Sequence, residues 1–189
     1  MERTPRVFLD ASVLYPVSLR HLLMRLALAG LFQPQWSAHV HEEWIRAVLR
    51  DNPQIPRARL LALRDAMDQR IDDAVVTGFE HLIGTLTLPD PDDRHVLAAA
   101  IVSGSSIILT RNLRDFPASA LGPHGIAACH PDVFIAGLLC AEAQSVIQAV
   151  RDQQASLINP PVPWQDLLAI FERTGLRGTV AELRRMLGL

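Results

Sequence analysis

Two apolar segments of the chain end in acidic or polar residues that could bind a metal ion. Residues 7–9 are followed directly by Asp10, and residues 106–109 are followed by Thr110 and then by Asp115. Short, continuous apolar runs are typical of buried strands in a parallel sheet, and ligands of such sheets bind beyond the carboxyl ends of the strands. We therefore expect Asp10 and Asp115 to lie at one edge of a sheet. An aspartate in this position can instead cap the helix that follows the strand.

Glu43 is the second candidate acid, and it lies in a segment that we expect to be helical. Ser37 is suited to cap a helix that runs to about Leu49. Glu42 precedes Arg46 by the four-residue spacing of an ion pair on a helix surface, so we expect Glu42 to face solvent. Glu43 then occupies either another surface position or a place in a functional site.

The third candidate is a group of three acids, Asp90, Asp92 and Asp93, at the start of an alanine-rich segment. We expect a helix from about residue 92 to about residue 102, ended by Gly104. Helix capping and the helix dipole explain one or two acids in a first turn, but three acids exceed what capping requires. This group as a whole is therefore a candidate for the site.

Several carboxylates at one sheet edge would repel one another, and a divalent cation removes that repulsion. Oxygen ligands favour Mg²⁺ or Mn²⁺ over zinc, and such ions commonly serve phosphoryl chemistry. A zinc site is disfavoured because the histidines form no HExxH motif and because Cys129 and Cys140 fit no zinc or redox spacing. We expect both cysteines to be reduced thiols of a cytoplasmic protein.

The composition is that of a folded protein without a global attraction to nucleic acid. Hydrophobic residues make up 49% of the 189 residues, and the formal net charge is −2. All 18 basic residues are arginines, which excludes a Schiff-base or P-loop lysine and suits bidentate contacts with phosphate. Any nucleic-acid surface must therefore be a local patch of arginines. We expect neither a signal peptide nor a membrane span, because the first residues and the apolar runs fit neither.

The order of the expected elements predicts an α/β core followed by a helical appendage. A third strand is expected at residues 126–129. Further helices are expected at about residues 16–29, 57–69 and 74–83. Strands that alternate with helices are typical of a parallel sheet covered by helices. From about Cys140 onward we expect amphipathic helices, and we predict a first domain at residues 1–139 and a helical extension at residues 140–189.

Four separate segments resemble the motifs of one family, the PIN-domain ribonucleases, in the family's order. They are VFLDASVLYP with Asp10, SAHVHEEW with Glu43, LPDPDDRHVLAAAIVSG with Asp93, and ILTRNLRDFP with Asp115. The match covers residues 6 to 136. Within the family, the chain is most similar to the PIN-type toxins of bacterial type II toxin–antitoxin systems, in the subgroup with a helical C-terminal extension.

The resemblance implies a three-layer α/β/α sandwich with a central parallel sheet and the activity of a Mg²⁺- or Mn²⁺-dependent endoribonuclease. Asp10, Asp93 and Asp115 take the places of metal ligands, with Asp92 as a further candidate. Glu43 completes the catalytic acids, which would hydrolyse RNA phosphodiester bonds with a metal-activated water. The resemblance further implies an antitoxin protein that blocks the site, and a homodimer.

Other residues close to these motifs are expected to support the reaction. Ser12, Thr110 and Asn112 would orient carboxylates or water molecules. An acidic site repels RNA, so basic residues nearby must hold the flanking phosphates. The candidates for this role are Arg46, Arg50, Arg57, Arg59, Arg111 and Arg114.

Other functions also have to be considered for this sequence. A phosphatase with an aspartate nucleophile usually needs a second acid two residues after the first, and Ser12 occupies that position here. A PIN-like module that only binds RNA or a partner protein is disfavoured because all four acid positions are filled. A housekeeping RNA-processing nuclease differs from a toxin in its target, and the sequence does not separate these two.

Overall fold

Strands and helices alternate along the first two thirds of the chain. The computed structural model describes residues 4–158 and 160–188. The strands are β1 (Arg6–Leu9), β2 (Gln33–Gln35), β3 (Ile107–Leu109) and β4 (Ala127–Cys129). The helices are α1 (Ala11–Leu14), α2 (Val17–Leu28), α3 (Ala38–Asp51), α4 (Arg57–Arg70), α5 (Glu80–Ile83), α6 (Arg94–Ser103), α7 (Ala118–Leu121), α8 (Pro131–Ala141), α9 (Ala143–Ser156), α10 (Trp164–Arg173) and α11 (Arg177–Leu187). Short 3₁₀ turns are η1 (Pro91–Asp93), η2 (Leu113–Asp115) and η3 (Gly122–His124).

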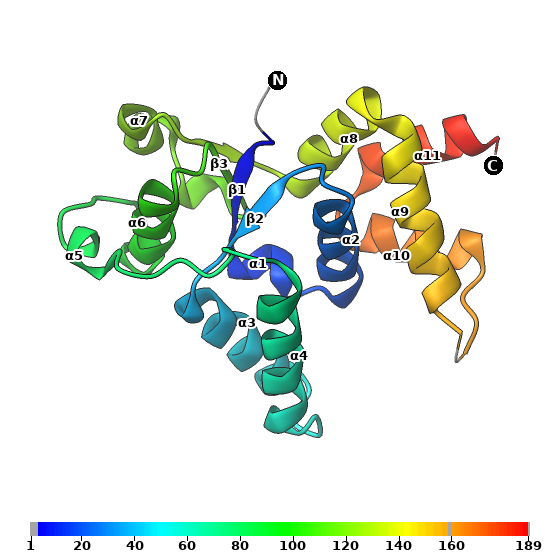
Figure 1. Cartoon of the computed structure of the whole chain (residues 1–189), viewed down its shortest axis with the longest axis horizontal. Coiled ribbons are helices and arrows are strands. Elements are labelled where there is room, and N and C mark those ends of the chain that lie inside the picture. The colour runs from blue at the N-terminus through cyan, green and yellow to red at the C-terminus, as the bar shows by residue number, and fades with distance from the viewer. Residues whose placement is uncertain (1–3, 159, 189) are drawn as a thin grey trace.

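The four strands form one parallel sheet in the order β2–β1–β3–β4 (Figure 1). Most of β1 is fully buried, as expected for a central strand with both faces covered. The chain passes from β1 to β2 on one side and later enters β3 on the other, so a topological switch point lies between β1 and β3. Leu9 pairs with Leu109 at this point. Asp10 and Thr110 therefore leave the sheet side by side at its carboxyl edge.

The segment after α4 differs from the sequence prediction of a helix over residues 74–83. Val75 forms a parallel bridge with Trp36, and the helix is confined to α5. The Trp36 backbone N–H donates to the Ala74 carbonyl at 2.9 Å, and the Val76 N–H donates to the Trp36 carbonyl at 2.8 Å. β-Branched residues favour an extended backbone, and here the free edge beyond β2 supplies the partner.

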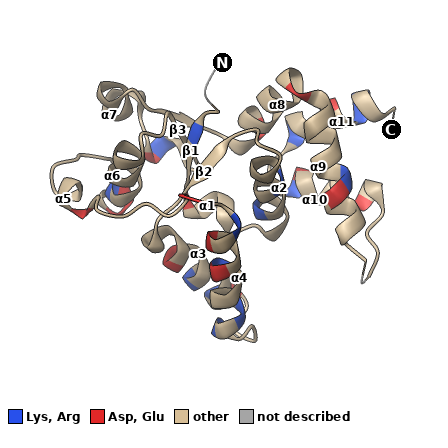
Figure 2. Cartoon of the chain, in the orientation of Figure 1, with Lys and Arg blue, Asp and Glu red and all other residues tan. Residues whose placement is uncertain are grey.

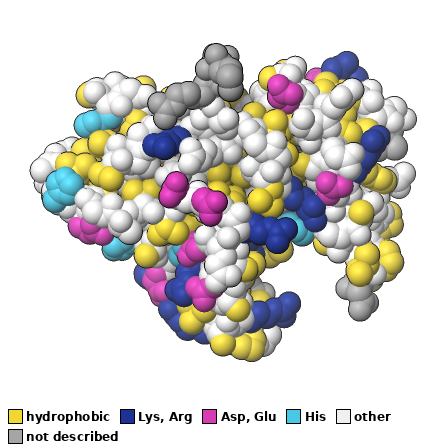
Figure 3. All heavy atoms as spheres, viewed as in Figure 1, with side chains coloured by type: hydrophobic (Ala, Val, Ile, Leu, Met, Phe, Trp, Pro, Cys, Tyr) yellow, Lys and Arg dark blue, Asp and Glu magenta, His cyan; other side chains and the backbone are white. Residues whose placement is uncertain are grey.

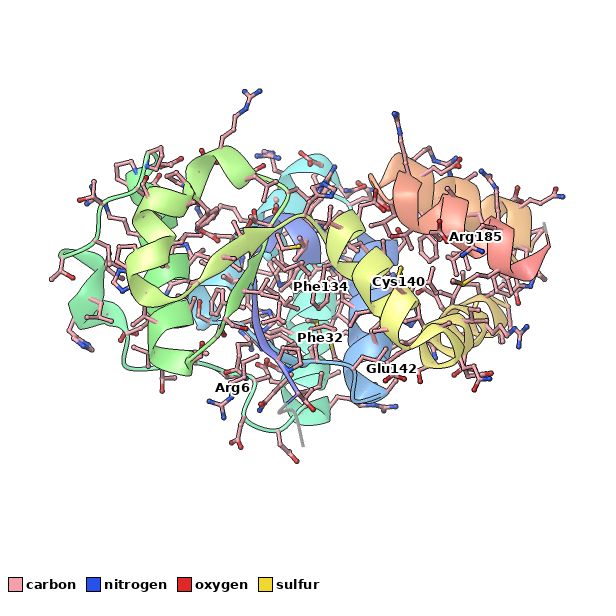
Figure 4. The ribbon with its side chains drawn as sticks, turned by 90° about the horizontal axis from the view of Figure 1, so that it is seen from above. Arg6, Phe32, Phe134, Cys140, Glu142 and Arg185 are labelled. Carbon is pink, nitrogen blue, oxygen red and sulfur yellow. The ribbon has the colours of Figure 1, made fainter. Side chains whose placement is uncertain are left out.

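Helices cover both faces of the sheet, which confirms the predicted α/β/α layers (Figure 1). On one side α6 packs against β1 and β3 through the buried alanines at 98–100, whose small side chains allow close approach. Gly104 ends α6 in the left-handed conformation, with φ 65°. On the other side lie α2 and α8. Phe134 of α8 meets Phe32 edge to face, with ring centroids 5.2 Å apart (Figure 4).

The C-terminal helices are attached to the core by packing and by hydrogen bonds. Helix α9 packs on α2 and α8, and α11 packs on α8 and α10. The carboxylate of Asp132 on α8 accepts the backbone N–H groups of Gly178 at 2.8 Å and Thr179 at 2.7 Å, which caps the first turn of α11. The predicted domain boundary between residues 139 and 140 falls within α8, and it stays a prediction.

Acidic and basic side chains are interspersed over the surface, in agreement with the small net charge (Figures 2 and 3). Within residues 4–158 and 160–188, no helix combines the length and the apolar character that crossing a membrane requires.

Candidate active site

Asp10 is a buried carboxylate at the carboxyl end of β1. Its backbone N–H donates to the Leu109 carbonyl at 3.1 Å, which ties it to β3. Its Oδ2 atom accepts hydrogen bonds from the hydroxyls of Ser12 at 2.5 Å and Thr110 at 2.8 Å. The side chain makes no capping hydrogen bond to α1. The alternative that Asp10 only caps a helix is therefore excluded.

The two hydroxyl groups are oriented by the loop that follows β3. The backbone N–H of Arg111 donates to Ser12 Oγ at 3.0 Å, and that of Asn112 donates to Thr110 Oγ1 at 3.0 Å. Each hydroxyl oxygen thus accepts from the backbone and keeps its own hydrogen for Asp10. Asn112 joins this network through its backbone, and its side chain is exposed.

Asp93, in η1 before α6, lies among other carboxylates. Burial, and after it the neighbouring negative charges, together raise the pKa of Asp93 from 3.8 to about 7. These neighbours, in decreasing order of effect, are Asp10, Asp90, Asp115 and Glu43. The structure therefore brings together acids from four separate segments of the chain, and we call Asp10, Glu43, Asp93 and Asp115 the acidic edge.

Asp90 and Asp92 differ from Asp93 in their surroundings. Asp90 Oδ1 accepts the backbone N–H of Asp92 at 2.9 Å, so Asp90 performs the capping role that the sequence left open. Asp92 is exposed and is not among the charges that raise the pKa of Asp93. Of the two adjacent acids, Asp93 is the one that faces the other carboxylates.

Glu43 on α3 has a partner that the sequence motifs did not identify. His95 Nε2 on α6 lies 2.9 Å from Glu43 Oε1. A carboxylate only accepts hydrogen bonds, so Nε2 carries the hydrogen in this contact. His95 is 7% exposed, and its Nδ1 is a buried atom without a hydrogen-bond partner in the described chain. In the sequence, this histidine follows Asp93 by two residues. Sequence patterns for zinc ligands gave it no role.

The partner predicted for Glu42 is wrong. Glu42 Oε2 pairs with Arg57 Nη2 at 2.7 Å, across the contact between α3 and α4, rather than with Arg46. The prediction that Glu42 faces solvent is confirmed, since its side chain is 43% exposed. Helix spacing indicated a possible local pair with Arg46, whereas the packing of α4 supplied Arg57, whose Nη2 donates to both carboxylate oxygens of Glu42.

The arginines that the sequence singled out fall into two groups. Arg50 pairs with Asp51, with Nε 2.9 Å from Oδ1, and Arg57 pairs with Glu42. Arg46, Arg59, Arg111 and Arg114 are exposed and have no ion pair within residues 4–158 and 160–188. Arg46 lies one helical turn from Glu43, on the same side of α3.

The donors of the acidic edge suit a hard divalent cation such as Mg²⁺ or Mn²⁺, because they are all carboxylate oxygens. In the described part of the chain, no three His, Cys, Asp or Glu side chains already stand at ligand spacing around one point. The acids are close enough to raise the pKa of Asp93 but do not surround one centre, as expected for like charges that repel one another. A cation would draw them together and remove the repulsion that raises the pKa of Asp93.

Comparisons with known proteins agree with this geometry. Residues 6–114 match the PIN domain family, and residues 131–185 match a family described as the VapC50 C-terminal domain. A Mycobacterium tuberculosis protein named "Putative ribonuclease VapC50" is 38% identical over 76 residues, which is 40% of this chain and 45% of that protein. The match thus spans less than half of the relative's length. No solved structure matches the chain.

Proposed function

Because the chain belongs to the PIN-domain family, we propose that it is a metal-dependent endoribonuclease that hydrolyses RNA phosphodiester bonds at the acidic edge. The observation that carries this proposal is the crowding of carboxylates around Asp93 at the switch point of the sheet. Such repulsion destabilises the metal-free fold, and a bound divalent cation would offset it.

Asp10, Asp93 and Asp115 are the proposed ligands of Mg²⁺ or Mn²⁺. Such a cation stabilises developing negative charge and makes water a stronger nucleophile at neutral pH. The hydroxyls of Ser12 and Thr110 hold Asp10 in one orientation, so this carboxylate needs little rearrangement to act as a ligand. Asp93 is proposed in preference to its exposed neighbour Asp92.

Glu43 is proposed to accept a proton from the attacking water or to hold that water in place. His95 fixes the Oε1 atom of Glu43, which leaves the second carboxylate oxygen available for that water. The contact joins α3 to α6, so both helices have to be in place before Glu43 and Asp93 face each other. This requirement ties the catalytic arrangement to the completed fold.

Exposed arginines beside the acidic edge are proposed to hold the RNA. Arg46 follows Glu43 by one turn of α3, and Arg111 and Arg114 lie in the loop that carries Asp115. Guanidinium groups bind phosphates bidentately and offset the repulsion between the acids and the RNA backbone. Arg50 and Arg57 are less suited to this role, because carboxylates already neutralise them.

The biological role that we propose is that of a toxin, controlled by an antitoxin protein and acting as a homodimer. The support is the match of residues 131–185 to the VapC50 C-terminal domain, and the 38% identity over 76 residues to the protein named "Putative ribonuclease VapC50". A housekeeping nuclease is the alternative. Expression in cells separates the two, since a toxin should arrest growth when produced alone and an Asp10→Asn variant should not.

The biochemical test is cleavage of total RNA and of a single-stranded oligonucleotide with Mg²⁺, Mn²⁺ or EDTA. The chain offers a matched set of variants, Asp10→Asn, Asp93→Asn and Asp92→Asn. The first two should lower kcat/KM by about a thousandfold, roughly 4 kcal/mol of transition-state stabilisation. Asp92→Asn should stay within a few-fold of the wild type.

Equal residual cleavage by the wild type, Asp10→Asn and Asp93→Asn would identify a contaminant and overturn the nuclease proposal. A loss in Asp92→Asn as large as that in Asp93→Asn would leave the nuclease in place and reassign the ligand.

A further inference from the structure

The turn between α10 and α11 reaches the carboxyl edge of the sheet. His130 directly follows β4, and Gly175 of the turn lies against it: a Cβ atom at Gly175 would lie 3.7 Å from His130 Cε1. The last residue of β4, Cys129, accepts the backbone N–H of Thr110 at 3.1 Å. A short series of direct contacts therefore leads from Thr110, which holds Asp10, to this turn of the C-terminal helices.

Two arginines on either side of this turn have no acidic partner. Of the four arginines in α10 and α11, Arg184 pairs with Glu172 at 2.6 Å and Arg185 pairs with Glu182 at 2.7 Å. Arg173 and Arg177 are exposed and form no ion pair within residues 4–158 and 160–188. The positive charges left uncompensated in these two helices are thus the ones nearest the sheet edge.

Arg173 and Arg177 line a hollow of about 450 Å³ together with Ala169 and Glu172. Glu172 is occupied by its ion pair with Arg184. The first backbone N–H groups of α11 are already satisfied by Asp132, so the guanidinium groups, and not the helix end, supply the attraction for an anion.

A further arginine, Arg111, lies in the loop after β3. Burial lowers the pKa of His130, the charge of Asp132 opposes that effect, and the charge of Arg111 adds to it, so both Asp132 and Arg111 lie within electrostatic reach of His130. Arg111 in turn donates its backbone N–H to Ser12 beside Asp10. Gly175, which lies between Arg173 and Arg177 in the chain, and Arg111 of the loop after β3 are therefore both close to His130.

We propose that Arg173 and Arg177 form a phosphate-binding rim that holds the substrate RNA a few nucleotides from the acidic edge, so that the C-terminal helices belong to the substrate site. This inference rests on the proposed nuclease function. RNA is favoured over a protein partner because planar guanidinium groups around a polar hollow suit phosphates, and because the acidic edge requires positive charge beside it.

The test compares two double variants that remove the same charge. Arg173→Ala with Arg177→Ala alters the rim, whereas Arg151→Ala with Arg185→Ala removes exposed arginines elsewhere. Arg185 lies eight residues beyond Arg177 on α11, about 12 Å along the helix, well to the side of the sheet (Figure 4). Both double variants should have the melting temperature of the wild type.

Steady-state cleavage of a single-stranded oligonucleotide should show a rise in KM of about tenfold for the rim variant, with kcat within about twofold. Binding of the same RNA, measured with an added Asp10→Asn substitution to prevent cleavage, should weaken in parallel. The slope of log K against log salt should fall by about 0.7 for each lost phosphate contact, and so by about 1.4. The control variant should match the wild type in all three quantities.

A rim variant that binds and cleaves RNA like the control would overturn the inference while the nuclease proposal stands. The same holds if only the oligomeric state or the binding of a partner protein changes. If no cleavage is found in any protein but RNA binding still depends on Arg173 and Arg177, the rim stands and the nuclease proposal fails.

Discussion

Helix α3 contributes to two polar regions of the molecule, and their electrostatics are opposite. At the acidic edge, Glu43 faces other carboxylates, and burial and repulsion raise the pKa of Asp93 to about 7. In the second region, which we call the tryptophan cluster (Trp36, His41, Trp44 and Asp68), polar groups are matched donor to acceptor. The tryptophans are fully buried and Glu43 and Asp93 are half-buried, and the two regions also differ in how their polar atoms are paired.

The tryptophan cluster joins Trp36, which directly follows β2, to α3 and α4 by a chain of hydrogen bonds. Trp36 Nε1 donates to Asp68 Oδ1 at 2.7 Å, and Trp44 Nε1 donates to His41 Nδ1 at 2.9 Å. His41 Nε2 lies 3.0 Å from the same Asp68 oxygen. The guanidinium of Arg20 covers the Trp44 ring, with Cζ 4.6 Å from the ring centre.

His41 illustrates how this pairing works. Because Nδ1 accepts from Trp44, the ring hydrogen lies on Nε2, which donates to Asp68. Burial lowers the pKa of His41, and Asp68 opposes that effect only in part. The contact is therefore a hydrogen bond from a neutral imidazole rather than an ion pair. Matched polar groups of this kind stabilise a unique packing, whereas the unmatched acids are the ones that we propose bind a cation.

Removal of Asp68 should have the largest effect on folding that this comparison predicts. Asp68→Ala leaves two buried donors unpaired, on Trp36 and His41, and should lower the free energy of unfolding by about 2–4 kcal/mol. The matched control is Asp65→Ala on the same helix, where an exposed acid pairs with its neighbour Arg64. Thermal or urea melts check this. Equal losses in the two variants would show that the tryptophan cluster adds little stability.

Loss of the contact between His95 and Glu43 should affect activity more than stability. His95→Leu should lower kcat/KM by about 10- to 100-fold and raise the metal concentration needed for half-maximal cleavage. His95→Gln retains a donor and should recover part of the loss. His39→Leu serves as the control, since this exposed ring lies 5.5 Å from His95. If the Leu and Gln variants are equally impaired, the hydrogen bond is not what positions Glu43.

The smallest predicted effect is a pH-dependent gain in stability of the metal-free protein. The folded pKa of Asp93 is about 7 and its ordinary value is 3.8, so ionisation destabilises the fold fully above pH 7, progressively less towards pH 3.8, and not below it. After allowance for partial exposure, Asp93→Asn should add about 1–2 kcal/mol at pH 8 in EDTA and almost nothing at pH 4.

Urea melts at several pH values check this prediction, with Asp92→Asn as the control. A gain of the same size at pH 4 and pH 8 would mean that charge crowding is not its cause. The tryptophan cluster should respond in the opposite sense. The depressed pKa of His41 means that the fold loses stability as the pH falls below the ordinary value of 6.5.

The sequence predicted the elements and the acids of this protein from local patterns. The apolar runs before Asp10 and Thr110 form buried parallel strands, and Ser37 caps α3 by accepting the Val40 N–H at 3.3 Å. These features follow from residues close together in the chain, because periodicity and capping depend on local backbone geometry. Where local preference was weak, as at residues 74–76, an open sheet edge decided the conformation.

Only the tertiary structure decided which side chains meet. Asp93 rather than Asp92 faces the other acids, Glu42 pairs with Arg57, and Glu43 meets His95 from a helix far away in the sequence. The approach of the α10–α11 turn to the sheet edge was likewise invisible in the sequence. The physical reason is that sequence spacing determines which face of its own helix or strand a side chain occupies. Its partner depends on the register and packing of elements that come together only in the folded chain.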